Sequence, residues 1–187
     1  MRVSLALLAM TLATAAPAPA AETVPVPGFR SVELRAGGEV TVVPGPAQRV
    51  TIVEGSSRFT RLRVLADGKL RIDTCAAQCP NHYRMRIEIQ SPRVPDLAIH
   101  GGGAIATRGG FRSQGQLAAA IDGGGKIDAR TLDAVSVSAA VNGGGEILVR
   151  PRTQLSAAVN GGGLVRFWGH PNVNVGIHGG GAVTPAS

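Results

Sequence analysis

The chain has 187 residues and a formal net charge of +7, with lysine only at Lys69 and Lys126, so arginine supplies most of the positive charge. A basic surface attracts polyanions such as lipopolysaccharide, acidic glycans or nucleic acid, although an arginine-rich proteome gives the same surface without such a partner. Only 3% of the residues are aromatic, which argues against a sugar-binding face built from aromatic rings and leaves Trp168 and Tyr83 as its obvious candidates.

The first twenty residues have the features of a secretory signal peptide. Arg2 gives a positive start, residues 5–12 form an apolar run too short to span a bilayer, and Ala18-Pro19-Ala20 fits the cleavage pattern. No cysteine lies near the cleavage point and no other long apolar run follows, so neither a lipid anchor nor a transmembrane segment is expected. We expect cleavage of residues 1–20, export to the periplasm or the extracellular space, and a single soluble domain at residues 21–187.

Residues 21–96 alternate between apolar and polar positions, which indicates half-buried strands. The dipeptide Asp67-Gly68 separates two alternating runs and is a strong signal for a hairpin turn. We expect irregular coils in this region that cover the N-terminal end of the fold. The clearest alternations are at Val32 and Leu34, Val40 and Val42, Val50 and Ile52, Leu62 and Val64, Leu70 and Ile72, and Ile87 and Ile89.

The two cysteines, Cys75 and Cys79, lie close together in the sequence Cys-Ala-Ala-Gln-Cys. In an oxidising compartment such a pair forms a disulfide, which here would fix a local turn. Metal binding with the nearby His82 is the alternative, but two cysteines and one histidine without a fourth ligand make a poor zinc site.

Five glycine triplets repeat in residues 97–187, and each is preceded by an aliphatic and then a polar residue. The period of about twenty residues predicts five stacked coils of a β-solenoid, each with a strand, a glycine corner and a second strand. Glycine suits a corner that needs positive φ, so we expect Gly144→Val and Gly162→Val to unfold or aggregate the protein. The corners begin at Gly101, Gly123, Gly143, Gly161 and Gly179.

The last coil has little sequence after it, since only residues 182–187 follow the final triplet. A coil without a neighbour leaves unpaired backbone groups at the edge of a sheet, and such edges promote self-association. We therefore expect that two or more copies can associate through the open C-terminal coil, unless the tail at residues 182–187 folds over it.

The run from Phe29 through Val40-Thr41-Val42, Val50-Thr51-Ile52, residues 67–72 and the glycine triplets resembles the GIN-domain family. This family is often labelled a putative auto-transporter adhesin head and was formerly a domain of unknown function. The resemblance covers nearly the whole mature chain and implies a single-stranded right-handed parallel β-helix in an exported bacterial protein. It implies no established activity and brings no catalytic residues. The chain has no room for a C-terminal membrane barrel, so self-transport is not expected.

Two columns of side chains are candidates for a site on the stacked coils. The polar residues before the triplets would stack in one column, which we interpret as turn residues bonded to local backbone because its two histidines are too far apart to share a metal. The second column has Arg108, Arg130, Arg150 and Trp168 five residues beyond successive triplets, with Arg166 on the same outward face. Stacked arginines repel unless Asp128 or an anionic ligand compensates, so this column is a candidate anion-binding stripe, with an ordinary solvated face as the alternative. The first column is His100, Asp122, Asn142, Asn160 and His178.

No cluster of serine, histidine and acidic residues has a recognisable catalytic spacing, and short glycine corners leave little to wall a cleft. We therefore expect a non-enzymatic, adhesin-like interaction module of the cell envelope, with no cofactor and no metal. A binder of anionic polysaccharide or lipopolysaccharide through the arginine column is the alternative, and a polysaccharide lyase or hydrolase is a third. The ligand and any partner, whether an anionic glycan or an envelope component, are not fixed by the sequence.

Overall fold

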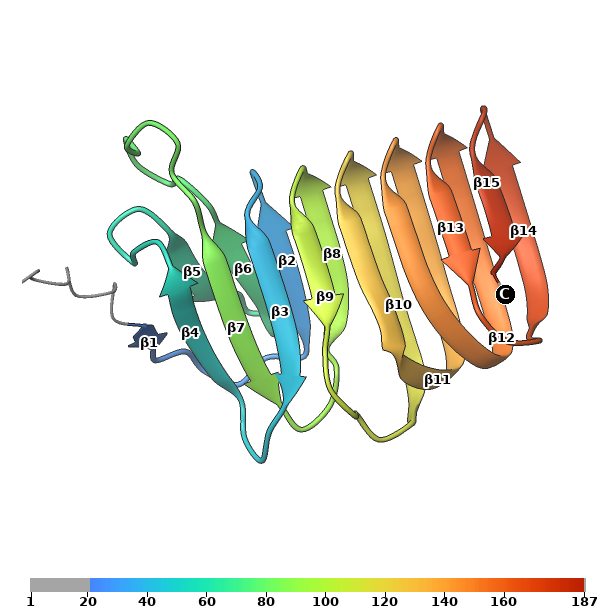
Figure 1. The fold of residues 1–187 in the computed structure, drawn as a ribbon, viewed down its shortest axis with the longest axis horizontal. Coiled ribbons are helices and arrows are strands. Elements are labelled where there is room, and N and C mark those ends of the chain that lie inside the picture. The colour runs from blue at the N-terminus through green and yellow to red at the C-terminus, as the bar shows by residue number, and fades with distance from the viewer. Residues whose placement is uncertain (1–20, 187) are drawn as a thin grey trace, which may run out of the picture.

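The structure is a computed structural model that describes residues 21–186, so the signal peptide expected at residues 1–20 lies outside the described part. Every regular element between residues 21 and 186 is a β-strand, which confirms the all-β class. Consistently, this part of the chain contains no helix long and apolar enough to cross a membrane. All fifteen strands belong to one sheet, which bends into two rows facing each other across an apolar interior (Figure 1).

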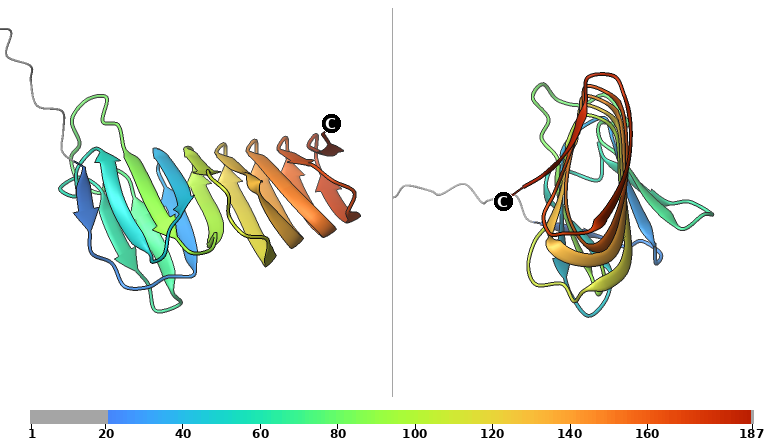
Figure 2. Two further views of the ribbon diagram at one scale, coloured as in Figure 1. Left: turned by 60° about the horizontal axis from the view of Figure 1, so that its bottom comes forward. Right: turned by 90° about the vertical axis from the view of Figure 1, so that its right-hand side faces the viewer.

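From β8 onward, the strands of the first row lead into the corners that carry the glycine triplets. Seen along the long axis of the molecule, the two rows and their connections trace a flattened closed outline (Figure 2). From the N-terminal end, the first row is β5 (Arg61–Val64), β6 (Lys69–Asp73), β2 (Ser31–Arg35), β8 (Asp96–Gly101), β10 (Gln114–Gly123), the second parts of β11 (Lys126–Gly143) and β12 (Glu146–Gly161), and β14 (Asn172–His178).

Apart from β1 and β4, the second row contains the strands that leave the corners. The long strands β11 and β12 contribute to both rows, because each turns from one row into the other within its length. From the N-terminal end, the second row is β1 (Glu22–Val24), β4 (Arg49–Glu54), β7 (Arg86–Ser91), β3 (Glu39–Pro44), β9 (Ala104–Thr107), the first parts of β11 and β12, β13 (Leu164–Phe167) and β15 (Ala182–Pro185).

Parallel pairing in residues 97–185 follows the period of the glycine triplets. Asp122 pairs with His100 on one side and Asn142 on the other, and the adjacent aliphatic residues pair in the same register. This register places the aliphatic residues in continuous ladders inside the two rows, where they are almost fully buried in every strand but the last two, β14 and β15. The central ladder consists of Ile99, Ile121, Val141, Val159 and Ile177.

The N-terminal third departs from this regular order. The strands β2 and β3 lie between β6 and β7 on one side and β8 and β9 on the other, so neighbours in space are not neighbours in sequence. Pairing is antiparallel where β4 meets β1 and β7, and where β5 meets β6. The β5–β6 hairpin turns at Asp67-Gly68 as the sequence predicts, with the Gly68 amide donating to the Leu65 carbonyl at 2.9 Å.

The two ends of the sheet rows differ in how they are protected. At the N-terminal end, β1 and β5 are short edge strands, and β5 carries two exposed arginines, which protects an edge from pairing. At the C-terminal end, β14 pairs only with β12, and its ladder residues Val173, Val175 and Ile177 are 42%, 43% and 41% exposed. Neither β14 nor β15 contains an Asp, Glu, Lys or Arg that would hinder pairing at this edge. Self-association through the open C-terminal coil therefore stays a prediction with a defined surface.

Each glycine of a triplet has a different structural role, as the triplet at Gly143 shows. Gly143 has φ of +119°, and a Cβ there would lie 2.5 Å from the Gly123 carbonyl oxygen. A Cβ on Gly145 would lie 2.6 Å from a methyl carbon of Ile121, whereas one on Gly144 would meet nothing within 4 Å. The expectation that Gly144→Val and Gly162→Val disrupt the fold is therefore wrong, because the middle glycines face open space and lie outside the left-handed region.

Candidate functional site

The ends of the second-row strands bring four of the predicted site residues together. Arg108 follows β9, Arg130 and Arg150 lie in β11 and β12, and Trp168 follows β13. They surround a hollow of about 520 Å³, which we call the arginine hollow. The sequence pattern did not single out the two threonines that complete it. Its lining is Ala106, Thr107, Arg108, Asp128, Arg130, Thr131, Arg150 and Trp168.

Arg130 is the fixed arginine of this hollow. Its guanidinium donates to both carboxylate oxygens of Asp128, at 2.8 Å from Nε and 2.6 Å from Nη2, and lies 5.2 Å from the centre of the Trp168 ring. Burial by itself would raise the pKa of Asp128, but the hydrogen bonds and charge of Arg130 outweigh it and hold that pKa below its usual value. Asp128 therefore stays ionised and neutralises this one arginine, as the sequence suggested it could.

Arg108 and Arg150 have weaker charge partners than Arg130 has. The register between β11 and β12 shifts between Ala129 and Asp133, so Arg150 lies opposite Asp133 rather than Arg130. The only ion pair of Arg150 within residues 21–186 is long, with Nε 4.0 Å from the Asp133 carboxylate, and Arg108 has none there. Because exposed pairs at such distances contribute little, two guanidinium groups remain free to bind an anion.

Arg166 does not take part in the arginine hollow. It is exposed and points outward, as expected for a residue two positions from Trp168, while Phe167 between them is buried. Its neighbours in register are Leu148 and Thr184, which lie outside the lining. Arg166 therefore lies outside the hollow, and its charge adds to the basic surface nearby.

The polar residues before the triplets do form one column along the first row. Asn160 donates from Nδ2 to the Asn142 side-chain oxygen at 2.8 Å, and His100 Nδ1 lies 3.5 Å from the Asp122 carboxylate. Contacts therefore run from strand to strand, beyond the local backbone contacts that the sequence suggested. The described residues contain no group of three or more potential metal ligands.

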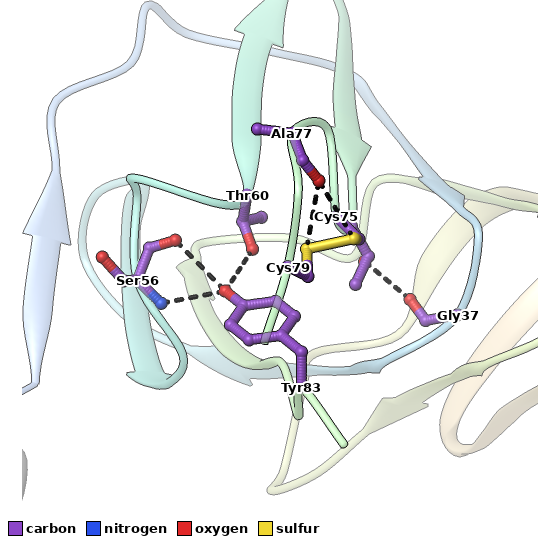
Figure 3. Close-up of a disulfide and its surroundings, with 8 residues drawn as sticks. Gly37, Ser56, Thr60, Cys75, Ala77, Cys79 and Tyr83 are labelled. Atoms are coloured by element: carbon purple, nitrogen blue, oxygen red, sulfur yellow. Dashed lines mark hydrogen bonds between the residues drawn. A yellow bond between two sulfur atoms is a disulfide. The ribbon is translucent and has the colours of Figure 1, made fainter. Parts of the chain in front are cut away.

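Cys75 and Cys79 are bonded to each other in the loop that follows β6 (Figure 3). This loop occupies the place that a glycine triplet takes in the later coils. The Tyr83 hydroxyl fastens it to the preceding loop, accepting from the Ser56 amide at 2.9 Å and lying 2.8 Å from the Thr60 hydroxyl. His82, the third ligand in the alternative metal hypothesis, has φ of +59° and belongs to no metal-ligand cluster among the described residues.

The described residues thus define a class of protein, an all-β scaffold of stacked parallel strands with a basic hollow on its surface. The resemblance of the sequence to the GIN-domain family is confirmed for residues 113–171, which match the family model described as "Putative auto-transporter adhesin, head GIN domain". No curated protein matches the chain.

Solved structures with a similar fold come from several bacteria. A putative adhesin from Bacteroides fragilis is 17% identical, covers 89% of this chain and 96% of its own, and superposes with a TM-score of 0.54. A putative cell adhesion protein from Clostridium sporogenes is 10% identical, with coverages of 89% and 98% and a TM-score of 0.37. A putative lipid binding protein from Parabacteroides distasonis is 14% identical, with coverages of 89% and 96% and a TM-score of 0.36. At these identities, only the first likeness carries an argument, and it concerns the fold alone.

Proposed function

We propose that this protein is exported by a signal peptide at residues 1–20 and acts as a non-enzymatic, adhesin-like interaction module of the cell envelope. The observation that carries the proposal is the match of residues 113–171 to an adhesin head domain, supported by a fold shared with a protein named as an adhesin. Residues 21–187 form one domain, and its stacked coils are those of a right-handed parallel β-helix. The coil-by-coil parallel pairing after residue 96 supports this architecture.

A second candidate function is the binding of anionic polysaccharide or lipopolysaccharide in the arginine hollow. Guanidinium groups bind carboxylate and phosphate through paired hydrogen bonds, and Arg108 and Arg150 are free to do so on either side of the fixed Arg130. Trp168 is half-buried beside them and can pack against a sugar ring. This arrangement favours an acidic saccharide over a simple inorganic anion.

Binding to immobilised heparin and to lipopolysaccharide tests this second candidate. The wild type should bind at low salt and elute as salt rises, because the attraction is between charges. Arg108→Ser with Arg150→Ser should remove most of the retention, while Arg93→Ser with Arg112→Ser removes the same charge from exposed positions outside the hollow and serves as the matched control. No retention of the wild type at low salt, or equal losses in both double variants, would contradict a specific site.

The broader role is tested separately by cross-linking the protein in its native envelope and identifying the partners. Recovery of a defined glycan or envelope protein would support an interaction module. The less favoured hypothesis, a polysaccharide lyase or hydrolase, predicts instead that the purified protein shortens a polysaccharide. Any such turnover would overturn the non-enzymatic proposal.

A further inference from the structure

A second hollow lies on the opposite corner of the fold, at the N-terminal end of the polar column. It has a volume of about 800 Å³, and we call it the N-terminal hollow. The ends of β2, β5, β6 and β8 meet there, together with the disulfide loop. Its lining is Arg35, Ala36, Arg61, Arg63, Asp73, Thr74, Cys75, Ala76, His100, Gly101 and Asp122.

The wall of this hollow is a loop held by a disulfide and by hydrogen bonds to neighbouring segments. The coil of β6 and β7 turns through residues 74–85, where later coils turn through a glycine triplet. Besides the disulfide, the Thr74 hydroxyl donates to the Gly37 carbonyl at 2.7 Å, and the Ala76 amide donates to the Phe59 carbonyl at 2.8 Å. The corner at this end of the molecule is therefore longer than the glycine corners and is held by more contacts.

Backbone strain is concentrated in the same wall. Among residues 21–186, three residues other than glycine have positive φ, and two of them, Ala36 at +64° and Cys75 at +57°, line the N-terminal hollow. A side-chain-bearing residue in this region costs about 1–3 kcal/mol, and such residues cluster at binding sites. The contacts of Thr74 and the disulfide hold this strained shape in place.

Two arginines of the N-terminal hollow have no strong charge partner among the described residues. Arg63 donates to the Asp73 carboxylate at 3.4 Å. Arg35 lies 3.9 Å from Glu33, but that buried carboxylate is already held by Lys69 and Arg71, both at 3.1 Å. Arg61 has no ion pair among the described residues, although it lies opposite Asp73 in the antiparallel register. Arg35 and Arg61 therefore face the hollow without strong partners of their own.

The hollow continues into the polar column without a break. Arg61, Asp73, Arg35, His100 and Asp122 occupy successive strands at the same register position. Asn142, Asn160 and His178 extend this line to the last coil. Neighbouring strands lie about 4.8 Å apart, so the column offers hydrogen-bonding groups at a regular spacing.

From this arrangement we infer that the N-terminal hollow binds the carboxylate or phosphate group of an acidic oligosaccharide, whose following sugars lie along the column at Asp122, Asn142 and Asn160. Arg35 and Arg61 bind the charged group. The carboxylate and amide side chains of the column form hydrogen bonds with sugar hydroxyls. The hydrogen bond between Asn160 and Asn142 permits this, because it uses the nitrogen of the Asn160 amide and the oxygen of the Asn142 amide and does not use the other polar atom of either side chain. The inference goes beyond the proposed function, since this site is separate from the arginine hollow and would hold even if that hollow bound nothing.

Titration calorimetry at low salt tests the inference with three probes: a galacturonate oligomer, a phosphorylated oligosaccharide of similar length, and a neutral oligosaccharide. The wild type should bind at least one acidic probe and not the neutral one, and the two acidic probes decide between carboxylate and phosphate. Arg35→Ser with Arg61→Ser should weaken this binding at least tenfold. Arg35→Lys with Arg61→Lys keeps the positive charges but loses the paired hydrogen bonds of a guanidinium. Its affinity should therefore lie between that of the wild type and that of the serine double variant.

Three further variants distinguish binding in the N-terminal hollow from binding elsewhere on the basic surface. Asn142→Ala with Asn160→Ala should weaken the oligomer several-fold but leave monomeric galacturonate or sugar phosphate unchanged. Arg93→Ser with Arg112→Ser should change little, and circular dichroism checks that all variants are folded. Equal losses in that control, or full binding by the Arg35 and Arg61 serine variant, would overturn the inference. If only Arg108→Ser with Arg150→Ser abolishes binding, the inference fails and the arginine hollow stands.

Discussion

Alanine substitutions within one glycine triplet should separate the two kinds of strain that shape the corners. Gly143→Ala forces a side chain into φ of +119° and puts its Cβ 2.5 Å from the Gly123 carbonyl oxygen. The left-handed conformation costs about 1–2 kcal/mol and the clash with fixed backbone costs about 1–3 kcal/mol more. We expect a loss of about 2–5 kcal/mol, a large share of a typical domain stability of about 5–15 kcal/mol.

The neighbouring glycines give the matched controls. Gly145→Ala has no positive φ but meets Ile121 at 2.6 Å and the Gly125 carbonyl at 2.8 Å, so it should lose only the clash part, about 1–3 kcal/mol. Gly144→Ala meets nothing and should be neutral or stabilise by up to about 1 kcal/mol through the unfolded chain. Urea unfolding followed by circular dichroism measures all three. Equal stabilities for Gly143→Ala and Gly144→Ala would refute this account of the corners.

Three other predictions follow from the described contacts. Burial alone would raise the pKa of Glu33, but the hydrogen bond from Lys69 and the charge of Arg71 outweigh it and lower that pKa in the folded protein. The ionised Glu33 therefore contributes its full stabilisation above the ordinary pKa of about 4.3, and this stabilisation is lost as pH falls through the lower pKa of the folded state. Urea midpoints from pH 7 to pH 3 should therefore fall less steeply in Glu33→Gln than in the wild type, and parallel curves would contradict this. Val175→Lys at the open C-terminal edge should abolish concentration-dependent association in sedimentation equilibrium. Val135→Lys, at a 45% exposed site away from that edge, should not change the association. A wild type that stays monomeric at millimolar concentration would exclude association through β14. Replacing Cys75 and Cys79 by Ser should lower stability by no more than about 2 kcal/mol because the closed loop is short, and a larger loss would mean that the bond supports more than its own turn.

The regular part of this fold can be predicted from the sequence because the chain repeats itself. The aliphatic residue before each triplet recurs, and the same residue type pairs with itself in the next coil, as Val141 does with Val159. Which glycine carries the strain cannot be found this way, since all three letters of a triplet are identical. It depends on which Cβ would meet the preceding coil, as at Gly143 and Gly145 but not Gly144.

The spatial order of the strands in the N-terminal third could not be predicted from the sequence, for a different reason. Each strand there has a correct alternating pattern, but the pattern says nothing about which strand lies beside it. Arg35 and Arg61 become members of one column only because β2 is placed between β6 and β8, with β5 added outside β6. The arginine column was visible because its members lie in consecutive coils, whereas the N-terminal hollow draws on strands whose spatial order differs from their order in the chain.

Both hollows lie where a coil departs from its repeat. At the arginine hollow, the extra residues between Ala129 and Asp133 shift the register, and this shift carries Arg130 away from Arg150 and toward Asp128 and Trp168. At the N-terminal hollow, a disulfide loop replaces a glycine corner. A perfect repeat would place like residues above one another, where stacked arginines repel. The irregular segments are therefore what allows several arginines to surround one space, and the repeat supplies the rigid frame that holds them there.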